Sequence, residues 1–302
     1  MYAQSQYGIR NTKNFMKGLL QNYSAGLKIL AFFVVLLFSL TLVLTVSGIV
    51  SNGNAADVSN LKILQLIQSV GLYVITPLIF AFLIDRKPFA FLKINRTGRT
   101  KSYFWVVLTM CAAIPFINLL GFLNQQVVFP EFLRGLENYF ITYEKELADL
   151  TEKFLTTSSF NGLIFNLFLI ALIPAVGEEL LFRGTIQQLI GGKNNQHLAI
   201  WITAFIFSAI HFQFYGFLPR FLLGAFLGYL FFWSKSIWLP IVAHFVNNAI
   251  VVIFYFLHIN KKITLNIDEI GTNTTWYLGL ASAAVVVVLL ILMRYENKET
   301  KY

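Results

Sequence analysis

The chain has 302 residues, of which 57% are hydrophobic and only 12% are charged, whereas a soluble globular domain carries about 25% charged residues. The formal net charge is +9, yet there is no zinc-finger or helix-turn-helix pattern and no basic face on a soluble module, which argues against a nucleic-acid partner. The single cysteine, Cys111, excludes a disulfide framework and a cysteine-based zinc site.

The predicted elements are apolar stretches long enough to span the hydrocarbon core of a lipid bilayer. Lipid offers backbone groups no hydrogen-bond partners, so each stretch is expected to be a helix. The sequence therefore predicts an all-α fold, a polytopic transmembrane helix bundle of about eight helices, with residues 1–302 forming a single integral membrane domain. The stretches lie near residues 29–50, 64–84, 103–123, 161–190, 198–215, 217–233, 237–257 and 275–293.

The charges between these stretches predict the orientation of the bundle. Basic residues gather before the first stretch, between the second and third, at Lys193 and Lys235, and after the last stretch. All these segments fall on one side of the membrane if eight helices alternate, and the acid-rich segment 124–160 falls on the other. The positive-inside rule then places both termini in the cytoplasm. Within the acid-rich segment, apolar residues at helical spacing predict an amphipathic surface helix over 136–155.

Three ionisable residues lie close together in the stretch 161–190. Such residues cost roughly 2.5 to 3.5 kcal/mol each inside a spanning helix, so they are candidates for function. Glu179 and Arg183 are four residues apart and share one helical face, which favours an ion pair. Glu178 is rotated about 100° from Glu179 and is left free. Two carboxylates beside one guanidinium leave surplus negative charge, so one carboxyl is suited to accept and return a proton.

Further polar side chains follow in later stretches. His211 and Glu178 each lie about 25 Å from the intervening Gly191-Gly192 turn along antiparallel helices, and at this matching depth they can hold one water molecule. If the hairpin protrudes from the membrane by a few turns, the pair is within reach of the cytoplasmic side. His244 and Asn248 share a helical face and offer N–H donors suited to an oxyanion. The neighbouring Asn247 is expected to point away, into a helix–helix contact.

Three motifs in this order resemble one known family. Glu-Glu-x-x-x-Arg at 178–183, Phe-x-x-x-His at 207–211 and His-x-x-x-Asn at 244–248 resemble the CAAX-prenyl protease type II family, also called CPBP after CAAX proteases and bacteriocin-processing enzymes. The resemblance covers a catalytic core at about 160–257. It implies a glutamic intramembrane endopeptidase without a cofactor, acting on a membrane-anchored protein or peptide.

The resemblance also implies a role for each of six residues. Glu178 and His211 activate the attacking water, His244 and Asn248 hold the developing oxyanion, and Glu179 and Arg183 support the geometry.

Three alternatives remain open from the sequence. The enzyme is a metalloprotease if zinc is held by Glu178, His211 and His244, although no His-Glu-x-x-His motif is present. The same polar cluster could instead form the ion path of a membrane transporter, or belong to a non-catalytic scaffold. The Phe-, Ile- and Asn-rich composition favours a bacterial source and a multi-pass location in the cytoplasmic (inner) membrane.

Overall fold

The computed structural model describes residues 17–51, 57–192 and 195–298, and no strand occurs among them. Lys193 and the basic residues within 1–16 and 299–302 lie outside this part of the chain. Seven helices in the described part are long and apolar enough to cross a membrane. They are α2 (Ala25–Ser51), the continuous helix Val58–Ile84, α6 (Thr100–Gln125), the continuous helix Phe160–Gly191, α12 (Phe217–Ser234), α13 (Trp238–Ile259) and the span Asn273–Arg294, most of which is α14 (Trp276–Lys298).

Both continuous helices contain wider, π-helical turns, which are frequent at functional sites. The first runs as α3 (Val58–Gln68), a π-helical segment (Ser69–Ile75) and α4 (Thr76–Ile84). The second runs as α8 (Phe160–Asn166), a π-helical segment (Leu167–Leu172), α9 (Ile173–Leu181), a π-helical segment (Phe182–Ile186) and α10 (Gln187–Gly191). The other helices are α5 (Pro88–Phe91), α7 (Arg134–Leu155), α11 (Gln196–Ala209) and the 3₁₀ turns Glu131–Leu133, Ile267–Glu269 and Asn273–Thr275.

The prediction of an eighth spanning helix over 198–215 is wrong in its length. α11 has 14 residues, or about 21 Å of helix, which is less than the roughly 30 Å of a hydrocarbon core. It ends at Ala209, and the chain turns through residues 210–216, where Phe212 adopts a positive φ of 54°. His211 therefore lies in a turn inside the bundle, not on a helix.

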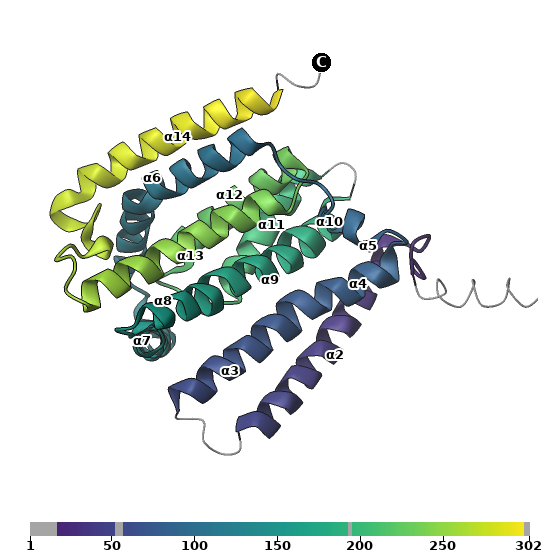
Figure 1. Ribbon diagram of the computed structural model, residues 1–302, viewed down its shortest axis with the longest axis horizontal. Helices are drawn as coiled ribbons and strands as arrows, with labels where there is room; N and C mark the ends of the chain where they lie inside the picture. Colours follow the sequence, from purple (N-terminus) through teal and green to yellow (C-terminus); the bar gives the residue numbers. More distant parts are fainter. Residues whose placement is uncertain (1–16, 52–56, 193–194, 299–302) are drawn as a thin grey trace, which may run out of the picture.

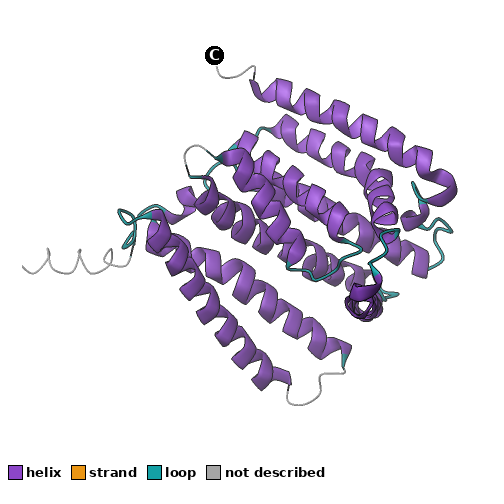
Figure 2. Cartoon of the chain, turned by 180° about the vertical axis from the view of Figure 1, so that it is seen from behind, coloured by secondary structure: helices purple, strands orange, loops and turns teal. Residues whose placement is uncertain are grey.

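The bundle has two edges and a centre. α14 packs on α6 along one edge, and α2 packs against α3 and α4 at the other, with the helices from α8 to α13 between them (Figures 1 and 2). The predicted amphipathic helix is present as α7, which lies across one end of the bundle (Figure 1).

The basic connections lie together at the end opposite α7. The backbone of Lys93 accepts a hydrogen bond from the amide of Ile237 at 3.4 Å, and the Trp238 indole donates to Ile94 at 2.8 Å. Gln188 near the end of α10 donates to the carbonyl of Phe91 at 2.9 Å. Acidic and basic segments are therefore separated along the bundle axis, as the loop charges predict (Figure 1).

Close packing of α12 on α11 is made possible by glycine. A Cβ placed on Gly224 would lie 3.2 Å from the Cα of Ala204 and 3.1 Å from the ring of Phe207. Because Gly224 has no side chain, the α12 backbone comes near enough for its carbonyl to accept a hydrogen bond from a neighbouring helix.

Candidate active site

Side chains from all three motifs line one cavity of about 300 Å³. Glu178 comes from α9, His211 from the turn after α11, and His244 with Asn248 from α13. Four polar side chains that are separated by up to 70 positions in the sequence thus face one space in an otherwise apolar bundle.

Glu179 joins two helices through a single oxygen atom. Its Oε1 accepts a hydrogen bond from Arg183 Nη1 at 2.6 Å, so the predicted ion pair is present, and both side chains are fully buried. The same Oε1 accepts a second hydrogen bond from His244 Nδ1 at 2.9 Å. Arg183 Nη2 also donates to the carbonyl of Gly224 at 2.9 Å. The carboxylate and guanidinium therefore hold α9, α12 and α13 in register.

The bond to Glu179 fixes the ring of His244. A carboxylate oxygen only accepts, so Nδ1 carries a proton and Nε2 is left for other partners. Nε2 lies 3.9 Å from Oε2 of Glu178, whose side chain is 14% exposed. Glu179 thus orients the imidazole that faces Glu178.

The spacing of Phe-x-x-x-His also has a direct physical cause. The carbonyl of Phe207 accepts a hydrogen bond from His211 Nδ1 at 2.7 Å, so the other ring nitrogen of His211 is available as an acceptor. The Phe207 ring lies 4.8 Å from the guanidinium carbon of Arg183 and edge-on to His244, with 5.9 Å between the ring centroids. Phe207 therefore contacts both of the other motifs.

The prediction for Asn247 is wrong. Its side chain lines the same cavity as Asn248, and its amide nitrogen donates to Asn248 Oδ1 at 3.2 Å. This bond occupies the carbonyl end of Asn248 and leaves its NH₂ group free to donate. The cavity is wide enough to take in two adjacent positions of one helix.

Arg220 was missed from the sequence although it lines the cavity. It is an ionisable residue near the start of a predicted spanning helix, and that position is the signal that could have identified it. Arg220 interacts electrostatically with Glu178. Glu144 of α7 interacts with the same guanidinium, so Arg220 is shared between a carboxylate of the cavity and one of the surface helix.

A zinc site needs three or four ligand side chains close together. Among the described residues, no three His, Cys, Asp or Glu side chains are grouped closely enough to hold one metal ion.

The cavity extends from the polar cluster toward α7. Its walls include Ile170 and Pro174, which precede Glu178 on the helix that starts beside α7, and Val251, which follows Asn248 on α13. Thr151 and Leu155 of α7 itself complete the lining. The lining residues of the cavity therefore reach from the polar cluster to α7.

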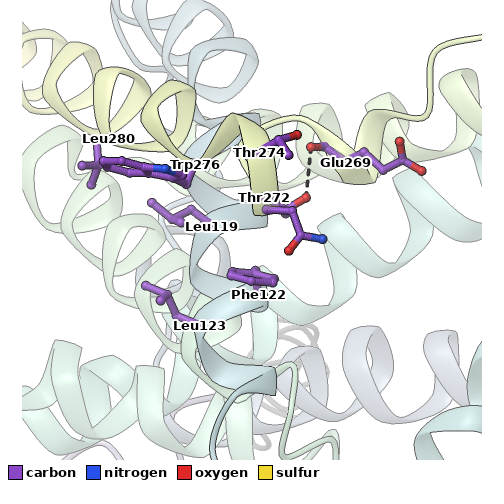
Figure 3. A pocket seen from close by; sticks show the side chains of 9 residues that line it. Leu119, Phe122, Leu123, Glu269, Thr272, Thr274, Trp276 and Leu280 are labelled. Atoms are coloured by element: carbon purple, nitrogen blue, oxygen red, sulfur yellow. Dashed lines mark hydrogen bonds between the residues drawn. The ribbon is translucent and has the colours of Figure 1, made fainter.

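A larger hollow of about 810 Å³ lies between α6 and the segment that leads into α14 (Figure 3). Its lining is apolar apart from the Thr and Asn side chains of residues 272–274 and Glu269, and no histidine faces it. It offers no pair of groups for acid–base chemistry, so the 300 Å³ cavity is the better candidate.

Comparisons with known proteins point to the same segment. Residues 160–250 match the family model for Rce1-like proteins, described as type II CAAX prenyl endopeptidase Rce1-like. The uncharacterized protein YpbD of Bacillus subtilis (strain 168) is 29% identical over 105 residues, which are 33% of this chain and 49% of that protein. The chain thus spans about half the length of the curated relative that it matches. No solved structure matches.

All three motifs fall within the matched residues, and the surrounding helices are those of an integral, multi-pass membrane protein. Over residues 160–250 the chain is therefore similar to the Rce1-like type II CAAX prenyl endopeptidases.

Proposed function

We propose that this protein is an intramembrane glutamic endopeptidase that hydrolyses a peptide bond in a membrane-associated protein or peptide. The observation that carries the proposal is the convergence of Glu178, His211, His244 and Asn248 on one cavity within a bundle of apolar helices. The match of residues 160–250 to the model of a prenyl endopeptidase family supports the same reaction.

Water activation is assigned to Glu178 and His211. The carboxylate of Glu178 accepts a proton from water as the water oxygen attacks the scissile carbonyl carbon, while the free ring nitrogen of His211 orients the water. The proton then passes from Glu178 to the leaving amine as the C–N bond breaks. Acid and amine are the products, and no covalent intermediate forms.

The oxyanion is assigned to Asn248 and His244. The NH₂ group of Asn248 donates directly, because its carbonyl end is held by Asn247. His244 donates through Nε2 only when both ring nitrogens carry protons, because Nδ1 is bonded to Glu179. The Glu179 carboxylate lies where it compensates that positive charge, and Arg183 fixes the carboxylate. Preorganised donors of this kind are a large source of rate enhancement.

We propose that the basic end faces the cytoplasm and α7 faces the opposite side, in the cytoplasmic membrane of a bacterium. The similarity to a Bacillus subtilis protein supports the bacterial membrane. The orientation is tested in a Cys111→Ser background by single cysteines introduced in place of Lys87 and Glu146. A membrane-impermeant maleimide added to intact cells should label only position 146, and labelling of position 87 instead would reverse the orientation.

The function is tested by comparing purified wild type with Glu178→Ala on a panel of membrane-anchored peptides in detergent, with products read by mass spectrometry. Glu178→Ala should abolish cleavage while the protein remains folded. Glu146→Ala, which removes an exposed carboxylate on α7, is the matched control and should cleave as wild type does. Cleavage by Glu178→Ala near the wild-type rate would refute the assignment. Loss of wild-type cleavage with a chelator would favour a metalloprotease.

A further inference from the structure

Arg220 has unused hydrogen-bonding capacity beside the catalytic groups. Its Nη2 donates to Oε1 of Gln213, whereas its Nη1 is buried and has no hydrogen-bond partner among the described residues. A buried donor without a partner costs about 1–3 kcal/mol, so such a group is expected to have a use. Arg183 also has one such atom, Nε, but its Nη1 and Nη2 donate to Glu179 and Gly224.

The backbone beneath Arg220 is shaped for its guanidinium group. A Cβ placed on Gly216 would lie 2.7 Å from Nη2 and 3.3 Å from Nη1 of Arg220. Gly216 has a φ of −100°, which any residue can adopt. The missing side chain therefore leaves room for the guanidinium, which a Cβ at this position would have to displace.

Arg220 interacts electrostatically with Glu144 and Glu178, but neither carboxylate forms an ion pair with it within 4.0 Å in the described part of the chain. The ion pairs found there involve Arg134, Arg183 and His244, and none reaches Arg220 within 4.0 Å. Much of the remaining cavity wall is apolar, including Leu155, Leu223 and Val251. A carboxylate entering this space needs a paired donor, and a guanidinium is the side chain best suited to supply one.

We infer that Arg220 binds a carboxylate group of the peptide substrate beside the scissile bond, and so selects an apolar peptide that carries one negative charge. The inference rests on the proposed peptidase function and adds a substrate class to it. The carboxylate comes either from the C-terminus of the peptide or from an Asp or Glu side chain, and the two sources share this chemistry.

The test uses two pairs of acetylated apolar hexapeptides with the full-length protein in detergent. The first pair differs only in a free C-terminal carboxylate against a C-terminal amide. The second pair is amidated and differs in Asp against Asn at one internal position. Binding is measured by titration and cleavage by mass spectrometry, for wild type, Arg220→Gln and Gly216→Ala. Arg134→Gln, the same exchange at an exposed ion pair on α7, is the matched control.

Wild type and Arg134→Gln should bind the charged member of at least one pair about tenfold or more tightly, as charge-assisted hydrogen bonds allow. Arg220→Gln should bring that ratio close to one, mainly through KM, and Gly216→Ala should reduce it by displacing the guanidinium. If Arg220→Gln loses the preference within the first pair, the carboxylate that Arg220 binds is the C-terminus of the peptide. If it loses the preference within the second pair, that carboxylate is an acidic side chain.

Equal binding of both members of each pair by wild type would overturn the inference, as would a preference that survives in Arg220→Gln and Gly216→Ala. An equal fall in kcat for all peptides, with the ratios unchanged, would also overturn it, because Arg220 would then act on the catalytic groups. The binding ratios are independent of turnover. Failure of the proposed peptidase function would appear as no cleavage of any peptide by wild type. It is therefore distinguishable from failure of the inference about Arg220.

Discussion

Removing the charge of Glu179 should destabilise the whole bundle. Glu179→Gln keeps the shape of the side chain but leaves Arg183, which is fully buried, without its bonded carboxylate. Removing one partner of a buried ion pair costs about 3–5 kcal/mol, because the other charge is left uncompensated in a medium of low dielectric. The free energy of unfolding in detergent should fall by that amount, as measured by denaturant titration followed by circular dichroism.

A double-mutant cycle isolates the contribution of the pair. Glu179→Gln, Arg183→Met and the double variant should give a coupling energy of about 1.5–3 kcal/mol, the range of a hydrogen bond to a charged group. The matched cycle uses Glu131 and Arg134, whose side chains are 86% and 67% exposed and lie 3.7 Å apart. Exposed pairs contribute about 0.2–1 kcal/mol. Similar coupling energies in the two cycles would refute the structural role given to the buried pair.

Three further results are expected. Asn248→Ala should lower kcat about a hundredfold, because an oxyanion donor is lost. Asn247→Ala should lower kcat less, because Asn247 only orients the amide of Asn248. Equal losses of rate in single-turnover assays of the two variants would contradict this order. Gly224→Val should lower the unfolding temperature by separating α12 from α11, whereas Gly26→Val, with no atom within 4 Å of its added Cβ, should leave it unchanged. Glu144→Gln should speed backbone hydrogen exchange in residues 211–217, because the Glu144 carboxylate accepts a 2.8 Å hydrogen bond from the backbone of that turn. Unchanged exchange would show that this hydrogen bond does not order the turn.

Local sequence spacing predicted the contacts that depend on helix geometry alone. Glu179 and Arg183 are four residues apart on one helix, and their ion pair is present. Hydropathy likewise located the seven spanning helices and, in α7, the surface helix.

The end of α11 could not be predicted, because apolar residues continue through Ile210, Phe212 and Phe214. The turn is set by tertiary contacts. Ser208 Oγ donates to the carbonyl of Phe217 at 2.7 Å, and Glu144 of α7 accepts from the backbone of Tyr215.

Arg220 was missed for a related reason. A basic residue near a helix end is ordinarily explained by a side chain that reaches the membrane surface. Its side chain instead lines the cavity, where Nη2 donates to Gln213 of the turn after α11. Asn247 was misassigned because adjacent residues on a helix point about 100° apart, which keeps one of them out of a narrow space only. The cavity here is wide enough for both Asn247 and Asn248 to line it.

The shared oxygen of Glu179 has a consequence for the synthesis of the protein. It takes one hydrogen bond from its own helix and another from His244, 65 positions later. While the chain is being made, the helix with both glutamates is produced before α13 has left the ribosome. At that stage neither the imidazole that faces Glu178 nor the amide of Asn248 is present. The cavity is therefore complete only after α13 has packed against the earlier helices.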